Sequence, residues 1–287
     1  MKKLCIICLL ALLLSMLGGC GDTPCQVVAA TAPIYTFTTA LCDGTDIEVS
    51  QLITENVSCL HDYTLQVSQM RMLESAELLI QNGAGLELFL EDIAPTCPVI
   101  DCSVGMALLG CDHDEEHEHH HHDADPHYWL SPDYAEQMVK NICAGLSDVY
   151  PEHTDTFSQN KEILLGKLTQ LKSDGEVELS SLKCRSLITF HDGFAYFADA
   201  FSLNILHSME EESGSEASAA ELKELIALIR EYELPAIFIE NNGSSAAAEI
   251  LAAEVGVSIS GLDMGMAELD YFDAMYHNIR MVKEALE

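Results

Sequence analysis

The sequence predicts an α/β protein of two lobes, each a mostly parallel β-sheet flanked by helices, joined by one long connecting helix. Short apolar runs rich in β-branched residues alternate along the chain with stretches of helical length and spacing. Such alternation is typical of βαβ units and a parallel sheet. The format occurs twice, on either side of one long helical stretch near the middle of the chain. With 48% hydrophobic residues in 287, each half has enough apolar side chains for a core.

In the first half of the chain, the sequence pattern predicts four strands and four helices. The strands are expected at residues 25–30, 46–53, 77–83 and 97–103. Helices are expected at 32–42, 69–76, 86–94 and 132–150. Ser68 is the expected N-cap of the second helix. Ser131 is that of the fourth, with Pro132 at its first position.

The second half repeats this order after a long helix. Apolar residues recur at helical spacing from Thr154 to about Leu171, which predicts the connecting helix. Strands are then expected at 186–190, 202–208, 235–240 and 256–263, and helices at 192–201, 218–232, 244–255 and 271–287. The predicted organisation is an N-terminal lobe over 25–150, a linker helix over 151–178 and a C-terminal lobe over 179–287.

The N-terminus has the layout of a secretory signal over residues 1–19. Lys2 and Lys3 precede an apolar run from residue 4 to residue 17, too short for a comfortable membrane span. The order Leu-Gly-Gly-Cys ending at Cys20 resembles a bacterial lipobox. This resemblance implies cleavage before Cys20, a lipid on its sulfur, and residues 20–24 as a tether. We therefore expect an extracytoplasmic protein, lipid-anchored to the bacterial cell membrane.

The chain is strongly acidic. Its formal net charge is −34, and removal of residues 1–19 takes away two lysines and no acidic residue, which makes it −36. This charge argues against nucleic acid as a partner, because phosphate binding needs Lys and Arg. It favours the attraction of cations.

Metal-binding side chains follow several predicted strands. His61 comes after 46–53, His127 after 97–103 and His191 directly after 186–190. Glu240 ends the strand 235–240, and Asp263 ends 256–263. Ligands of open parallel sheets bind outside the carboxyl ends of the strands. Three imidazoles with one carboxylate suit zinc, whereas an oxygen-richer set would favour manganese.

Ligands drawn from both halves would place the ion between the lobes. Each ligating ring also needs a neighbouring group that fixes its orientation. Asp62, Asp192 and Glu240 are the nearby carboxylates that the sequence offers for this role.

An acidic, histidine-rich segment covers residues 111–124 and has no apolar periodicity, so it is predicted as a loop. Its six histidines are His113, His117, His119, His120, His121 and His122. One interpretation is an accessory loop that gathers zinc weakly or senses it. The alternative is a spacer that binds metal only incidentally.

Six segments of the chain then point to a family. They are "HDYTLQVSQ", "SAELLIQNGAGLE", "DPHYWLSPDYA", "ITFHDGFAYFADAF", "FIENNGSSAAAEILAAEVG" and "LDMG". With the lipobox, their order resembles the metal-binding solute-binding proteins of ABC importers (cluster A-I, TroA-like fold). The zinc-uptake, ZnuA-like group is the most similar. The resemblance covers nearly the whole mature chain and implies two α/β lobes joined by one stiff helix, with the ion between them.

The resemblance also implies functional residues and partners. The family's ligands match His61, His127, His191 and Asp263, and Glu240 matches a second-shell or alternative ligand. The implied cargo is Zn²⁺, and the implied partners are an ABC permease and its ATPase, with the receptor expected as a monomer. Three positions depart from the family pattern. Val67 and Met264 stand where proline is usual, and "FIENN" departs from the more usual Glu-x-Gln pattern.

Other functions stay open from sequence. A manganese receptor or adhesin-type lipoprotein would share the anchor and the lobes. A secreted zinc hydrolase would need an open metal position and a placed base, but the chain has no H-E-x-x-H motif. The sequence therefore favours a receptor over an enzyme.

Overall fold

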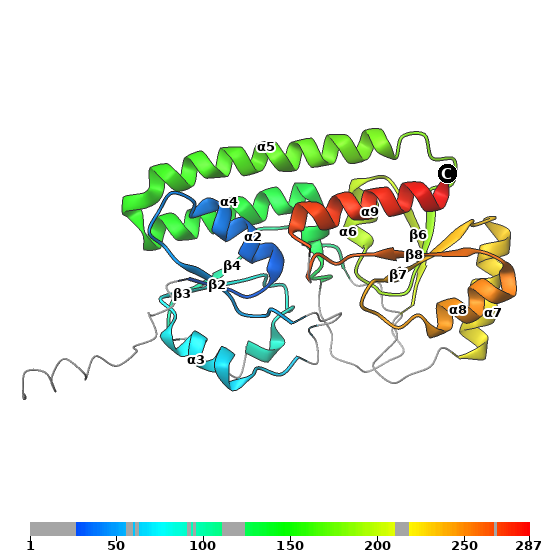
Figure 1. The fold of residues 1–287 in the computed structure, drawn as a ribbon, viewed down its shortest axis with the longest axis horizontal. Coiled ribbons are helices and arrows are strands. Elements are labelled where there is room, and N and C mark those ends of the chain that lie inside the picture. The colour runs from blue at the N-terminus through cyan, green and yellow to red at the C-terminus, as the bar shows by residue number, and fades with distance from the viewer. Residues whose placement is uncertain are drawn as a thin grey trace, which may run out of the picture.

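The fold consists of two four-stranded parallel sheets with helices on both faces (Figure 1). The computed structural model describes residues 27–55, 60, 63–90, 93, 96–110, 124–209, 218–266 and 269–287. Every strand pairing within these residues is parallel. The predicted fold class is confirmed.

The N-terminal sheet has the order β2-β1-β3-β4. Its strands are β1 (Val27–Ala29), β2 (Val49–Gln51), β3 (Leu78–Gln81) and β4 (Val99–Asp101). The helices of this lobe are α2 (Ala32–Leu41), α3 (Val67–Ser75) and α4 (Pro132–Val149). In Figure 1, α2 and α4 lie on one side of the sheet and α3 on the other. The central β1 is fully buried, as expected for a strand covered on both faces.

The C-terminal sheet repeats this topology as β6-β5-β7-β8. Its strands are β5 (Ser186–Thr189), β6 (Asn204–Ser208), β7 (Ala236–Glu240) and β8 (Ser258–Leu262). Its helices are α6 (Ala195–Ala200), α7 (Ala219–Glu231), α8 (Ala246–Val255) and α9 (Tyr271–Leu286). A capping box between Ser218 and Glu221 starts α7, and left-handed Gly256 ends α8.

The helix α5 (Thr154–Glu178) connects the two halves. It packs against α2 and α4 of the first half and against α9 of the second, and it extends along one side of the whole molecule (Figure 1). It continues beyond Leu171 to Glu178. Leu164, Leu168 and Leu171 are buried, whereas Ile163 is 60% exposed. The lobe boundaries themselves stay a prediction.

Two local predictions are wrong. The expected helix over 86–94 is only a 3₁₀ turn, η2 (Leu88–Leu90), in the residues described there. The Glu87 side chain folds back onto the preceding turn instead of starting a helix. The helix α3 begins at Val67, with Gln66 rather than Ser68 at its N-cap, because Gln66 and Gln69 form a reciprocal capping box.

No helix in the described part of the chain is long and apolar enough to cross a membrane. The predicted signal segment, the tether and Cys20 lie outside the described residues.

Candidate metal centre

His127 lies between Asp125 and the 3₁₀ turn η3 (Tyr128–Leu130), and its ring is held by a buried carboxylate. Its Nδ1 lies 2.8 Å from Asp125 Oδ1, and its backbone N–H donates to the same oxygen at 2.9 Å. Both residues are 7% exposed. A ring that donates Nδ1–H to a carboxylate presents its Nε2 lone pair in the other direction, which is the orientation used by carboxylate-supported metal ligands.

His191 follows β5 and brings a second imidazole to the same place. The centroids of the His127 and His191 rings are 5.4 Å apart, and the ring planes meet at 84°. The Nδ1 atom of His191 lies 3.6 Å from Oε2 of Glu240, the last residue of β7. Glu240 is only 2% exposed. This carboxylate therefore faces His191 much as Asp125 faces His127, although at longer range.

A glycine makes room for the His191 ring. A Cβ on Gly193 would lie 2.6 Å from Cε of Met264 and 2.8 Å from Cδ2 of His191. Both distances are shorter than real Cβ contacts allow, so no larger residue fits without a shift. Met264 is 3% exposed, and its methyl group and the His191 ring occupy the space beside Gly193.

Asp263 is buried directly after β8, and its main chain is fixed by Asn278 of α9. The Asp263 N–H donates to Asn278 Oδ1 at 2.7 Å, and Asn278 Nδ2 donates back to the Asp263 carbonyl at 2.7 Å. Its Oδ1 accepts the Gly265 N–H at 2.7 Å.

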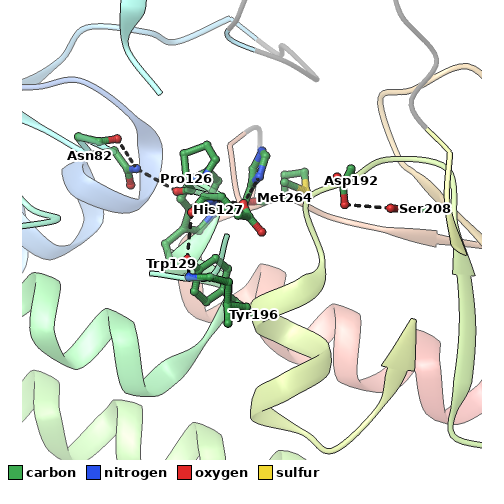
Figure 2. A network of polar contacts seen from close by, with 11 residues as sticks. Asn82, Pro126, His127, Trp129, Asp192, Tyr196, Ser208 and Met264 are labelled. Carbon is green, nitrogen blue, oxygen red and sulfur yellow. Dashed lines mark hydrogen bonds and ion pairs between the residues drawn. The ribbon is translucent and has the colours of Figure 1, made fainter. Parts of the chain in front are cut away.

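Buried hydrogen bonds join the two lobes around His127 (Figure 2). The Tyr196 hydroxyl of α6 donates to the Asp125 carbonyl at 3.0 Å. Trp129 Nε1 donates to the Met264 carbonyl at 2.7 Å, and the Tyr271 hydroxyl donates to the Trp129 carbonyl at 2.9 Å. The segment that carries His127 is therefore held by both lobes.

Part of the predicted site lies outside the described residues. His61, Asp62 and all six histidines of the 111–124 loop lie outside the described residues. Within the described ranges, no three His, Cys, Asp or Glu side chains form a complete metal site. The structure brings His127, His191 and Glu240 together. Asp263 directly precedes Met264, whose carbonyl accepts the Trp129 Nε1–H.

Asp125 was not predicted to support this site, and Asp192 lies elsewhere than predicted. Asp125 orients His127, and its signal was the D-x-H spacing two residues before the ring. Asp192 was expected to orient a ring, but its carboxylate accepts a hydrogen bond from Ser208 Oγ at 2.9 Å, at the end of β6 (Figure 2).

Comparison with known proteins fits this geometry. The ZnuA family model, described as a periplasmic zinc-uptake complex component A, matches residues 27–285. The chain belongs to the ZnuA family. The description names a component of an uptake complex rather than an enzyme.

Two relatives of this ZnuA-family protein are zinc-binding proteins. The zinc-binding protein AdcA of Streptococcus pyogenes serotype M3 is 29% identical over 286 residues, which cover 90% of this chain and 55% of AdcA. The zinc-binding lipoprotein AdcA of Streptococcus pneumoniae strain R6 is 28% identical and covers 93% and 57%, respectively. The chain thus spans little more than half the length of these relatives.

Solved structures support the same fold. A crystal structure of ZnuA is 27% identical, covers 91% of this chain and 99% of its own, and gives a TM-score of 0.81. A zinc-bound variant of AdcAII from Streptococcus pneumoniae is 24% identical, covers 91% and 98%, and gives 0.80. A manganese-bound periplasmic protein from Candidatus Liberibacter asiaticus is 20% identical, covers 91% and 99%, and gives 0.78. At such identities, the last two support the fold alone.

Proposed function

We propose that this ZnuA-family protein captures Zn²⁺ between its two lobes outside the cytoplasm and delivers it to an ABC permease and its ATPase. The observation that carries the proposal is the approach of His127 and His191, one from each lobe, with ring centroids 5.4 Å apart. The Nδ1 atom of each ring faces a buried carboxylate. Neutral imidazoles supported in this way suit zinc.

The proposed first shell is His61, His127, His191 and Asp263, with Glu240 as the orienting group of His191 or an alternative ligand. Two imidazoles and two buried carboxylates already lie in the described part of this set. A third imidazole favours zinc over manganese, since manganese prefers oxygen ligands. The names of the AdcA relatives, which are zinc-binding proteins, support the same metal.

Calorimetry of the mature protein, from Cys20 onward, with Zn²⁺ and with Mn²⁺ tests the proposal. We expect tight binding of zinc and weaker binding of manganese. His61→Ala, His127→Ala and His191→Ala should each weaken zinc binding. His153→Ala is the matched control, because its Nε2 pairs with Asp46 at 2.9 Å, next to α5 and away from the site. Tighter binding of manganese than of zinc would refute zinc as the cargo. If neither ion bound, the proposed role as a metal receptor would be refuted.

Delivery and anchoring are tested in cells. The lipobox predicts that labelled palmitate is incorporated into the wild type but not into a Cys20→Ala variant. A strain that lacks the protein should grow poorly in zinc-depleted medium and recover with the wild type but not with His191→Ala. An adhesin would keep its partner when His191 is lost, so normal growth of the His191→Ala strain would argue against transport.

The histidine-rich loop is proposed as an accessory zinc collector. Its composition is the support, since six histidines and several acidic residues occur within residues 111–124. A deletion of residues 112–124 should lower the number of zinc ions bound per chain and impair growth in scarce zinc. Unchanged stoichiometry and growth would mean that the segment is a spacer.

A further inference from the structure

The turn between β3 and η2, residues 82–87, lies beside the candidate metal centre, although it supplies none of the predicted ligands. Its sequence is Asn-Gly-Ala-Gly-Leu-Glu. Three successive residues, Gly83, Ala84 and Gly85, have positive φ angles of 78°, 54° and 80°. Alanine rarely adopts this left-handed conformation. Strain of this kind persists only where surrounding groups hold the backbone, and it often occurs near functional sites.

One carboxylate holds the turn through hydrogen bonds, and a second one packs against it. Glu87 is 6% exposed, and its Oε1 and Oε2 accept the N–H groups of Asn82 at 2.7 Å and Gly83 at 3.0 Å. On the other side, a Cβ on Gly83 would lie 1.9 Å from Oδ1 of Asp101, so only glycine fits there. These two buried hydrogen bonds fix the Asn82 and Gly83 peptides.

Asn82 connects this turn to the segment that carries His127 (Figure 2). It is fully buried, and its Nδ2 donates to the Pro126 carbonyl at 3.1 Å. Its own carbonyl accepts a hydrogen bond from the Tyr128 hydroxyl. Pro126 and Tyr128 are the residues directly before and after His127, so Asn82 contacts the chain on both sides of the ligand.

We propose that Asn82, held in place by Glu87, is a positioning residue that presents the His127 imidazole to the incoming zinc ion. Asp125 orients the ring. Asn82 fixes the main chain from which the ring projects. The two sets of contacts use different atoms, because Asp125 binds the ring and the N–H of His127, whereas Asn82 binds Pro126 and Tyr128. The inference rests on the proposed zinc function and extends it to a residue outside the ligand set.

A purely structural role for Asn82 makes a different prediction. Loss of buried hydrogen bonds destabilises any fold, but it alters zinc affinity only if the bonds act on a ligand. If Asn82 acts through His127, its effect on affinity should disappear once His127 is gone. A double-mutant cycle on zinc affinity therefore separates the two roles.

The cycle compares the mature wild type, Asn82→Ala, His127→Ala and the double variant by competition with a zinc chelator. Asn82→Ala should raise the zinc Kd about tenfold, the lower end of what loss of a supporting contact costs a metal site. In the His127→Ala background, the same change should alter Kd by less than about twofold. Equal weakening in both backgrounds would overturn the proposal.

Asn141→Ala is the matched control. Its Nδ2 donates to the carbonyls of Cys102 at 2.8 Å and Val104 at 3.0 Å, next to no predicted ligand. It should lower the unfolding midpoint without changing the zinc Kd. If Asn82→Ala behaves in the same way, positioning is refuted.

Tyr128→Phe decides the matter if Asn82→Ala does not fold, because it removes only the hydroxyl that donates to the Asn82 carbonyl. Weaker zinc binding by folded Tyr128→Phe supports the proposal, and unchanged binding overturns it. A wild type that binds no zinc would instead refute the proposed function itself, and this inference with it.

Discussion

Asp125 determines which nitrogen of His127 faces the candidate centre. A single carboxylate oxygen accepts both the backbone N–H and the Nδ1–H of the same residue, at 2.9 and 2.8 Å. The ring is thereby fixed in one tautomer and one rotation before any ion binds. Such pre-organisation lowers the entropy that zinc capture has to overcome.

Substitution of Asp125 by asparagine should weaken zinc binding while the fold is kept. The amide is nearly isosteric, but its oxygen is a weaker acceptor for the Nδ1–H of His127. We expect a loss of about 10- to 100-fold in affinity, measured by chelator competition. Asp133→Asn is the control, since Asp133 pairs with Lys172 on the surface. An unchanged Kd in Asp125→Asn would show that the carboxylate is dispensable.

Gly193→Ala tests the space beside His191. The added Cβ would lie 2.6 Å from Met264 Cε and 2.8 Å from His191 Cδ2, so we expect the His191 ring to be displaced together with Met264. Zinc affinity should fall, while the folded structure, measured by circular dichroism, is retained.

Gly166→Ala is the matched control for this substitution. Gly166 lies in α5 with nothing within 4 Å of a built Cβ, so alanine should stabilise the helix by up to about 1 kcal/mol without changing zinc affinity. Equal zinc affinities in the two variants would contradict the role assigned to Gly193.

The residue types of the site were predictable, but their supporting contacts were not. His127, His191 and Asp263 follow strands and lie in recognisable motifs, so strand-end reasoning selected them. Asn82 binds the main chain of Pro126, next to His127, and Asn278 binds the main chain of Asp263. In both cases the two partners are far apart in sequence. Such contacts depend on tertiary packing, and no local pattern encodes them.

At the scale of elements, the sequence pattern predicted all eight strands and all eight α-helices of the described chain, apart from small shifts at their ends. The failure at residues 86–94 has a local cause. The apolar spacing there is helical, but Glu87 turns back to bind the N–H groups of Asn82 and Gly83. A buried side-chain contact thus overrode a pattern that was otherwise typical of a helix.

The same turn predicts a pH dependence of stability. Burial raises the pKa of Glu87 from 4.5 to about 7, although two backbone N–H groups favour its charged form. The folded state therefore binds more protons than the unfolded state between these pH values. The stability that this carboxyl contributes is fully present below about pH 4.5 and is lost as the pH rises through 7.

Urea unfolding of the metal-free protein at several values between about pH 5 and pH 8 checks this sign. The free energy of unfolding of the wild type, relative to Glu87→Gln, should decrease as the pH rises. Glu284→Gln removes the same charge from an exposed position on α9 and is the control. If the free energy of unfolding depends on pH in the same way in Glu87→Gln and in Glu284→Gln, the Glu87 carboxyl is not the titrating group.

At the scale of the whole molecule, one apolar core joins the two lobes. It runs from β1 through Leu164, Leu168 and Leu171 of α5 to Leu286 of α9. A second, smaller cluster lies in the C-terminal lobe and includes Leu251 of α8. Repeated α/β architecture in the sequence predicted two lobes, but it could not predict that they share a core. That sharing depends on how α4, α5 and α9 pack together.

A shared core predicts that both lobes unfold in one transition. The single tryptophan, Trp129, is 1% exposed at the junction and reports its local unfolding, whereas far-UV circular dichroism reports all helices. The two signals should coincide for the zinc-free protein, as two-state unfolding requires. Leu168→Ala, in the large core, should lower the stability by about 2–5 kcal/mol and shift both curves together.

Leu251→Ala makes a comparable cavity in the smaller cluster, where Leu251 is fully buried. If that cluster is coupled to the main core, the Trp129 curve shifts together with the dichroism curve. If it unfolds independently, dichroism is lost first, while the Trp129 transition stays at the wild-type position. The second outcome would mean that the β7–α8 region opens without disturbing the junction. Glu240 could then leave His191 while Asp125 still holds His127.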